Sequence, residues 1–295
     1  MSADRTRLPS FLVIGAMKAG TTSLYHYLRH HPQVFMPRIK ELDFFAGEGN
    51  WRRGLGWYTR QFAEAGPGAI AIGEASTTYS KYPRYQGVAE RIAQHVPHAL
   101  LVYVVRNPID RIRSHYQHRV AVGAETEPME SALIENPIYL DYSRYAMQID
   151  QYVSHFPRER LLIVTSEDLR HDRLRTIGHV YAFLGVDPDW VPPTLDREFY
   201  RTEGRPIYPS ALWPVRRTIR RWFPAAKRAK ELVDSFRLGV SEDHGRGSAV
   251  TTAIGSSARA EIPPGLRRLL EDHLRDDIRR LHAYLGPSFD GWGIS

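Results

Sequence analysis

Residues 11–23 read FLVIGAMKAGTTS, and this stretch decides the fold. Its first four residues are apolar and predict a short buried strand, while Leu24, Tyr27 and Leu28 beyond it are spaced for one face of a helix. Between strand and helix lies a glycine-bounded loop. Such a loop at a helix N-terminus forms an anion cradle, because backbone N–H groups and the positive end of the helix dipole converge there. We therefore expect a phosphate-binding loop.

Strands and helices alternate from this stretch to about residue 199. We expect strands at 11–14, 69–72, 100–105 and 161–164, and helices after Gly20 and at 86–95, 108–122, 143–156 and 174–184. This alternation predicts an α/β fold, a P-loop-like domain whose central parallel β-sheet has helices on both faces. Because the pattern stops near residue 199, we expect one domain over 8–295, in which 199–260 forms a lid and a C-terminal helix at 264–285 packs back on the core.

The composition narrows the classes of function. The 295 residues include no cysteine, which excludes a disulfide scaffold, a thiolate metal site and a cysteine nucleophile. No apolar run reaches the ~18 residues of a membrane span, and the first ten residues lack a secretory signal, so we expect a cytoplasmic protein. The 40 Lys and Arg residues against 33 Asp and Glu give a net charge of +7, which favours an anionic partner.

The predicted loop departs from the Walker pattern of nucleoside triphosphatases. Thr21 stands where that pattern has its lysine, and the lysine of this chain lies inside the loop, at Lys18. We expect the phosphate to be bound by Lys18 and the residues that follow it, Ala19, Gly20, Thr21, Thr22 and Ser23. A P-loop nucleotide kinase or triphosphatase stays open as an alternative, although the sequence has no clear Walker B strand ending in Asp.

A second anion site is predicted after the strand at 100–105. Arg106 stands at the carboxyl end of this strand, where ligands bind in open α/β sheets, and Ser114 follows in the next helix. We expect Arg106 and Ser114 to hold a second, separate phosphate. We interpret Arg111 and Arg113 as ordinary arginines of the helix surface.

The stretch PRIKELDFF, residues 37–45, places charged residues directly before paired aromatics. A carboxylate at the edge of an apolar floor is partly buried, which raises its pKa toward the range that suits a general base. Glu41 is the candidate for that role. The same stretch also fits a surface loop with a hydrophobic anchor, so the residues alone leave both interpretations open.

Together these motifs resemble the sulfotransferase superfamily that uses 3′-phosphoadenosine 5′-phosphosulfate (PAPS), in particular the bacterial relatives of its heparan sulfate sulfotransferase branch. The resemblance covers about residues 9–200 and resumes in the final helix. It rests on the segments KAGTTSL (18–24), KELDFF (40–45), GLGWY (54–58), GEASTTY (73–79), RNP (106–108), SHY (114–116), FPRER (156–160), EDL (167–169) and FLG (183–185).

The resemblance implies transfer of a sulfuryl group from PAPS to a hydroxyl or amine of a glycan, glycolipid or small molecule, without a metal. It implies that residues 18–23 bind the 5′-phosphosulfate, with Lys18 on the bridging oxygen, and that Arg106 and Ser114 hold the 3′-phosphate. Glu41 would be the general base, and 3′-phosphoadenosine 5′-phosphate (PAP) the product. The heparan sulfate enzymes have a lysine in place of Ala75 and a histidine in place of Asp43, which argues against a heparan-type acceptor.

The stretch 212–230, rich in Arg and Trp, supports a different class of function. Its arginines alternate with aromatic and aliphatic residues, as in a basic amphipathic helix that could lie on an anionic membrane or polymer. It also fits a packed helix with a solvated arginine face, or a lid over the acceptor cleft. A noncatalytic binder of an anionic polymer or membrane is therefore the second alternative; we do not expect nucleic acid as a partner.

Overall fold

The computed structural model describes residues 8–195 and 261–294. The chain divides into two compact units. Among the described residues, the first unit contains 8–115, 136–195 and 263–294, and the second contains 116–135 and 261–262. All the site residues predicted above lie in the first unit.

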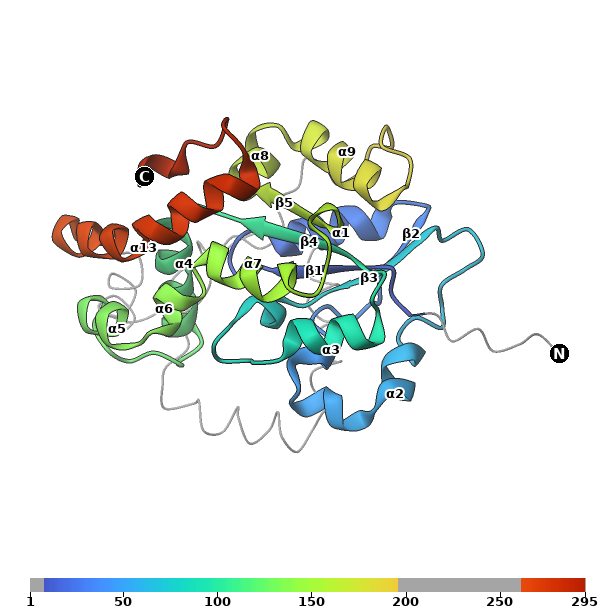
Figure 1. Ribbon diagram of the computed structural model, residues 1–295, viewed down its shortest axis with the longest axis horizontal. Coiled ribbons are helices and arrows are strands. Elements are labelled where there is room, and N and C mark those ends of the chain that lie inside the picture. Colours follow the sequence, from blue (N-terminus) through green and yellow to red (C-terminus); the bar gives the residue numbers. More distant parts are fainter. Residues whose placement is uncertain (1–7, 196–260, 295) are drawn as a thin grey trace, which may run out of the picture. The chain divides into compact units, whose positions relative to one another are not determined.

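The first unit is built on a five-stranded sheet in the order β2-β3-β1-β4-β5 (Figure 1). Every neighbouring pair of strands is parallel. The strands are β1 (Phe11–Gly15), β2 (Val34–Phe35), β3 (Ala71–Ala75), β4 (Leu100–Val105) and β5 (Leu161–Thr165). The predicted α/β fold with a central parallel sheet is confirmed. Strands β1 and β4 are continuous apolar runs because side chains on both of their faces are buried.

The predicted boundaries of β3 are wrong. We expected a strand at 69–72, but β3 begins at Ala71 and continues through Gly73 to Ala75. Gly73 lies opposite Phe11 of β1 in the sheet register. A Cβ at Gly73 would come within 2.4 Å of the Phe11 ring, so the glycine admits an aromatic ring instead of ending the strand.

Helices cover both faces of this sheet. The structure has α1 (Thr21–His30), α2 (Leu55–Arg60), α3 (Val88–His95), α4 (Pro108–Ala121), α5 (Met129–Glu135), α6 (Ile138–Asp141), α7 (Tyr145–Val153), α8 (Ser166–His171), α9 (Arg173–Leu184) and α13 (Pro264–Leu285). Short 3₁₀ turns are η1 (Phe44–Ala46), η2 (Gly49–Arg53), η3 (Thr77–Ser80), η4 (Arg158–Arg160) and η7 (Gly291–Gly293).

The direction of the strand connections decides which face each helix covers. The crossover from β1 through α1 runs toward β2, whereas those through α3 and α7 run the other way along the sheet. Right-handed crossovers therefore place α1 on one face and α3 with α7 on the other (Figure 1). Helix α9 lies on the same face as α1, because the Tyr181 hydroxyl of α9 donates to the Tyr27 carbonyl of α1 at 3.1 Å.

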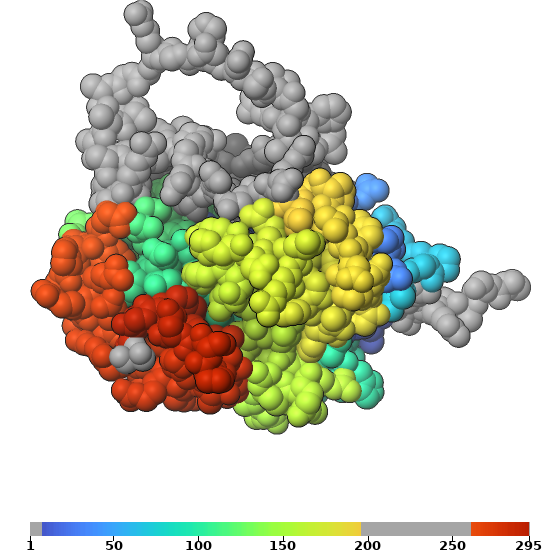
Figure 2. All heavy atoms as spheres, turned by 90° about the horizontal axis from the view of Figure 1, so that it is seen from above, coloured from blue at the N-terminus to red at the C-terminus, as the bar shows by residue number. Residues whose placement is uncertain are grey.

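Helix α13 packs against α7 (Figure 2). The buried Asp277 carboxylate accepts hydrogen bonds from the backbone N–H groups of Ala146 and Met147, at 3.0 and 2.9 Å. These N–H groups belong to the first turn of α7, where a helix has no partners of its own and favours negative charge. Arg280 forms an ion pair with Asp150 on the same two helices.

The second unit is described over 116–135 and 261–262. Within it the Tyr116 hydroxyl donates to the Glu127 carbonyl at 3.0 Å, and Arg119 pairs with Glu125 at 3.4 Å. The predicted lid at 199–260 and the stretch 212–230 lie outside the described residues. Of the helices in 8–195 and 261–294, none has both the length and the apolar composition needed to cross a membrane.

Candidate active site

The loop after β1 has the geometry of an anion cradle. It joins Gly15, the last residue of β1, to Thr21, the first of α1. Lys18 and Gly20 have positive φ angles of 71° and 98°, which turn the backbone sharply before the helix. Gly20 has no side chain that could cap α1, and the positive end of the helix dipole at this N-terminus favours a ligand of negative charge.

Arg106 at the end of β4 reaches this loop. Its guanidinium Nη1 donates to the Lys18 carbonyl oxygen at 3.3 Å, and Nη2 lies 3.9 Å from Asp110 Oδ2. The Tyr145 hydroxyl donates to the Arg106 carbonyl at 2.7 Å and fixes the backbone there. Strands β1 and β4 are neighbours whose following connections leave in opposite directions, the arrangement that opens a ligand crevice in such sheets. The structure therefore brings Lys18 and Arg106 together.

The residues of α4 near Arg106 differ in burial and in their partners. Ser114 is 7% exposed and lies four residues after Asp110, hence on the helix face that turns toward Arg106. Our interpretation of Arg111 as a surface residue is wrong, because its side chain is fully buried. Its Nε donates to Ser143 Oγ at 2.7 Å and its Nη2 to the Tyr139 carbonyl at 2.8 Å, so polar atoms of the following segment pair two of the three nitrogens of the buried guanidinium. Arg113 pairs with Asp110 at 3.2 Å.

Glu41 lies at the same edge of the sheet. Its backbone N–H donates to the Ala75 carbonyl, which ends β3, at 2.9 Å. Its Oε1 accepts hydrogen bonds from Lys40 Nζ at 2.7 Å and from Thr77 Oγ1 at 3.3 Å. Thr77 begins η3, and Ser80 at the end of η3 lies where a Cβ on Gly15 would be. The turn η3 thus connects Glu41 to the start of the cradle loop.

The predicted pKa shift of Glu41 has the wrong sign. Burial acts to raise the pKa of this carboxyl, but the charge and hydrogen bond of Lys40, the charge of Lys81 and the Thr77 hydroxyl together bring the pKa below its usual 4.5. The prediction considered the apolar neighbours but not the adjacent Lys40 or Lys81, which is distant in the chain. Glu41 is therefore ionised at neutral pH, and its side chain is 40% exposed, so it can receive a proton from a bound molecule.

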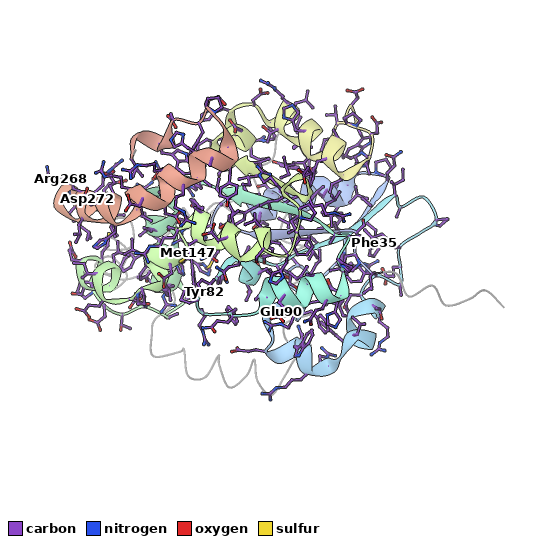
Figure 3. All side chains as sticks on the ribbon, viewed as in Figure 1. Phe35, Tyr82, Glu90, Met147, Arg268 and Asp272 are labelled. Atoms are coloured by element: carbon purple, nitrogen blue, oxygen red, sulfur yellow. The ribbon has the colours of Figure 1, made fainter. Side chains whose placement is uncertain are left out.

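Lys81 is a site residue that the sequence analysis missed. It is half-buried, and burial lowers its pKa although the carboxylates of Glu41 and Asp43 act to raise it. Gln148 of α7 fixes the adjoining backbone, because its amide accepts from Tyr82 N–H and donates to the Tyr82 carbonyl, both at 2.8 Å. Figure 3 shows Tyr82 close to the part of α7 that carries Met147. The signal in the sequence was the position of Lys81, two residues after the segment 73–79.

Glu74 was also missed, although it lies within the segment GEASTTY. It is only 1% exposed in the middle of β3, and burial raises its pKa to about 7. Its carboxylate accepts hydrogen bonds from the hydroxyl groups of Tyr58, Ser76 and Tyr79. A carboxylate at an inward position of an otherwise apolar strand was the available signal, because a buried charge needs such partners.

A cavity of about 270 Å³ opens at the segment that follows Glu41. It is lined by Asp43, Ala46, Glu48, Gly49, Asn50, Thr78 and Tyr85. Two of these residues adjoin the Glu41 site, since Asp43 is in the same segment and Thr78 follows Thr77. Within 8–195 and 261–294, no group of three or more His, Asp or Glu side chains is arranged to hold a metal ion.

Comparison with protein families gives a match to the family model described as "Sulfotransferase domain", over residues 8–199. Among curated proteins, the human bifunctional heparan sulfate N-deacetylase/N-sulfotransferase 3 is 30% identical over 203 residues, which are 62% of this chain and 23% of the human protein. The mouse N-deacetylase/N-sulfotransferase 4 is 30% identical over 204 residues, with the same coverage of 62% and 23%. The chain thus matches about a quarter of the length of these relatives.

Solved structures give two further similarities. A sulfotransferase from Alicyclobacillus acidocaldarius is 25% identical, with a TM-score of 0.68 over 97% of this chain and 99% of that one. The mouse sulfotransferase SULT7A1, solved in complex with PAP, is 14% identical, with a TM-score of 0.50 over 98% of this chain and 88% of that one. The second similarity is one of fold.

Proposed function

This chain belongs to the sulfotransferase family, and from that premise we propose that it transfers a sulfuryl group from PAPS to a hydroxyl or amine of an acceptor. One observation carries the proposal. Arg106 from β4 meets the Lys18 loop from β1, and η3 links that loop to the ionised Glu41. Two residues with cationic side chains, which suit an anionic donor, thus share an edge of the sheet with a carboxylate that can take a proton.

The residues at the ends of β1 and β4 suit a donor with two separate anionic groups. We assign the 5′-phosphosulfate to Lys18, Ala19, Gly20, Thr21, Thr22 and Ser23, where a helix N-terminus, a lysine and hydroxyl groups meet. We assign the 3′-phosphate to Arg106 and Ser114, because the Arg106 fork supplies several donors from a half-buried position.

The transfer follows from these assignments. Glu41 takes the proton of the acceptor hydroxyl or amine, whose oxygen or nitrogen forms a bond to sulfur as the bond from sulfur to the phosphate oxygen of the donor breaks. The electron pair of that bond leaves with PAP, and Lys18 stabilises the negative charge that develops on the leaving oxygen. A sulfuryl group carries less charge than a phosphoryl group, so we expect the transfer to need no metal ion.

We propose the acceptor by its chemical class. The cavity lined by Asp43 and Thr78 offers carboxylate, amide, hydroxyl and phenol groups to an acceptor, which fits a glycan, a glycolipid or a small molecule. Asp43 and Ala75, at the two positions that differ from the heparan sulfate enzymes, lie next to this carboxylate. A single domain over 8–295 with an acceptor-side lid at 199–260, a cytoplasmic location and a membrane contact through 212–230 belong to the same proposal and rest on the sequence.

The proposal is tested by supplying PAPS labelled with ³⁵S to a panel of neutral glycans, glycolipids, phenols and amines. We expect labelled acceptor and PAP to form in equal amounts. Glu41→Gln should lower the rate by ~10²–10⁴-fold, whereas Glu64→Gln, at a side chain that is 74% exposed, should not change it. Transfer that is equally fast in Glu41→Gln would contradict the assigned base, and phosphate transfer from ATP would favour a nucleotide kinase.

A further inference from the structure

Glu74 is the centre of a buried hydrogen-bond network that reaches the segment carrying Glu41. In this network, Oε1 accepts from the Tyr58 hydroxyl of α2 at 2.8 Å and from the Tyr79 hydroxyl of η3 at 2.6 Å. Oε2 accepts from Ser76 Oγ at 2.7 Å. The carboxylate therefore joins β3, α2 and η3 at one point below the candidate active site.

Two of these three hydroxyl groups also hold the backbone of residues 41–45. The Asp43 N–H donates to Ser76 Oγ at 3.0 Å, and the Phe45 N–H donates to the Tyr79 hydroxyl oxygen at 3.3 Å. A hydroxyl group has a single hydrogen. Since that hydrogen is donated to the carboxylate, the lone pairs of each hydroxyl are turned toward the backbone N–H. The ionised carboxylate thus sets the direction of both contacts.

The segment 41–45 needs such contacts because its backbone is unusual. Glu41 and Asp43 have positive φ angles of 64° and 50°, a region that residues with a Cβ occupy only where their surroundings hold them. The Leu42 carbonyl accepts from Asn50 Nδ2 at 2.8 Å. The N–H groups of Asp43 and Phe45 donate to the side chains of Ser76 and Tyr79.

We propose that Glu74 is a positioning residue for Glu41: its carboxylate orients the Ser76 and Tyr79 hydroxyls that hold residues 41–45, and its protonation releases this segment. The proposal rests on the proposed function, in which Glu41 must meet the acceptor. When Glu74 is protonated, the oxygen that carries the proton becomes a donor, so the hydroxyl opposite it loses its acceptor and is no longer held with its lone pairs toward the backbone. Because the proton can sit on Oε1, opposite Tyr79, or on Oε2, opposite Ser76, both contacts are weakened in turn.

The release is expected near neutral pH. The groups that face Glu74 are the hydroxyls of Tyr58, Tyr79 and Ser76, with the carboxylate of Asp43 further away. Burial raises the pKa of Glu74 to about 7 and the Asp43 charge acts the same way, while the three hydroxyls act to lower it. Glu41 loses its charge only at lower pH, because its pKa lies below 4.5. Two separate transitions should therefore appear in the activity.

Amide hydrogen exchange of the full chain tests the release without an acceptor. Between pH 5.5 and 8.5, and after correction for the intrinsic pH dependence of exchange, we expect the protection of the Asp43 and Phe45 amides to fall by about tenfold below pH 7, as for the loss of one hydrogen bond. In Glu74→Gln it should be low at every pH. Protection that is independent of pH, or equal in Glu74→Gln and the native protein, would overturn the proposal.

Single hydroxyl variants keep the test informative if Glu74→Gln folds poorly. Ser76→Ala should expose the Asp43 amide alone and Tyr79→Phe the Phe45 amide alone, whereas Tyr58→Phe should affect neither. Equal loss at both amides in each variant would indicate a general loosening and contradict the assigned contacts.

The catalytic consequence has its own measurement. With an acceptor from the panel, kcat should show the transition near pH 7 and KM for PAPS should not, and Glu74→Gln should lack that transition. If Glu74→Gln leaves the pH profile of kcat unchanged, Glu74 does not position Glu41, even if the hydrogen-exchange result is as expected. PAP binding, measured beside it, reports on the proposed function itself, so a failure of the donor site is seen separately.

Discussion

Glu74→Gln should make the folded protein more stable at pH 8 while it weakens catalysis. The carboxyl of Glu74 has its pKa raised from 4.5 to about 7, chiefly by burial, so the folded state binds a proton more tightly here than the unfolded chain does. This difference corresponds to about 3 kcal/mol at ~1.4 kcal/mol for each tenfold change in proton affinity. Gln has the shape of the protonated group and avoids the cost of burying the charge.

The sign of the pH dependence follows from linkage. Because the folded-state pKa is raised, the stability contributed by protonated Glu74 is fully present below pH 4.5 and is lost as the pH rises to about 7. Chemical denaturation of the native protein and of Glu74→Gln between pH 5 and 9 measures this. We expect the free energy of unfolding of the variant to exceed that of the native protein by an amount that grows as the pH rises, up to about 3 kcal/mol above pH 7.

Subtracting the two proteins cancels the titration of all other groups, so the difference isolates Glu74. A variant that is less stable than the native protein at pH 8, or a difference that stays constant over this range, would refute the reasoning. The expected pairing of higher stability with lower kcat is the trade-off of a buried charge kept for positioning.

Three further substitutions test other parts of the account. Glu41→Gln should leave PAP binding intact. In the native protein, kcat should fall as the pH falls through the Glu41 pKa, below 4.5, because only the ionised carboxylate takes the acceptor proton. Activity that rises toward low pH would contradict this. Lys18→Ala should lower kcat by ~10²–10³-fold, measured as PAP release. An unchanged rate would show that Lys18 does not stabilise the charge on the leaving oxygen. Gly73→Ala puts a methyl group 2.4 Å from the Phe11 ring and should cost ~1–3 kcal/mol in urea denaturation, whereas Gly68→Ala, with no atom within 4 Å, should cost far less; equal costs would show that the ring moves aside.

The sequence predicted the parts of the fold that have local causes. The strands at 11–14 and 100–105 are continuous apolar runs, and the structure has β1 and β4 there within one residue. The helix ends at Gly185 and at Pro108 also follow from the local effects of these residue types. Strand β3 was placed wrongly because the meaning of Gly73 depends on Phe11, a neighbour across the sheet.

In the candidate site, too, features with local causes were predictable and features that depend on distant residues were not. The position of Lys18 and Arg106 at one edge of the sheet was predictable, because parallel strands bring their carboxyl ends together, Lys18 lies in the loop after β1 and Arg106 follows β4 directly. The burial of Arg111 was not, since its partners are Ser143 Oγ and the Tyr139 carbonyl of a later segment. The sign of the Glu41 pKa shift needed the contact of the Lys40 ammonium with the carboxylate and the position of Lys81, and the role of Glu74 needed hydroxyl groups from two other elements.

Calorimetric binding of PAP, beside ADP and ATP with and without magnesium, tests the central claim most directly. We expect PAP to bind tightly without magnesium, ADP to bind more weakly because it lacks the 3′-phosphate, and PAP binding to be lost in Arg106→Ala. Arg113→Ala, which alters a neighbouring arginine that shares the Asp110 carboxylate, should bind PAP as the native protein does. A preference for ATP with magnesium, or PAP binding that Arg106→Ala leaves unchanged, would contradict the assigned donor site.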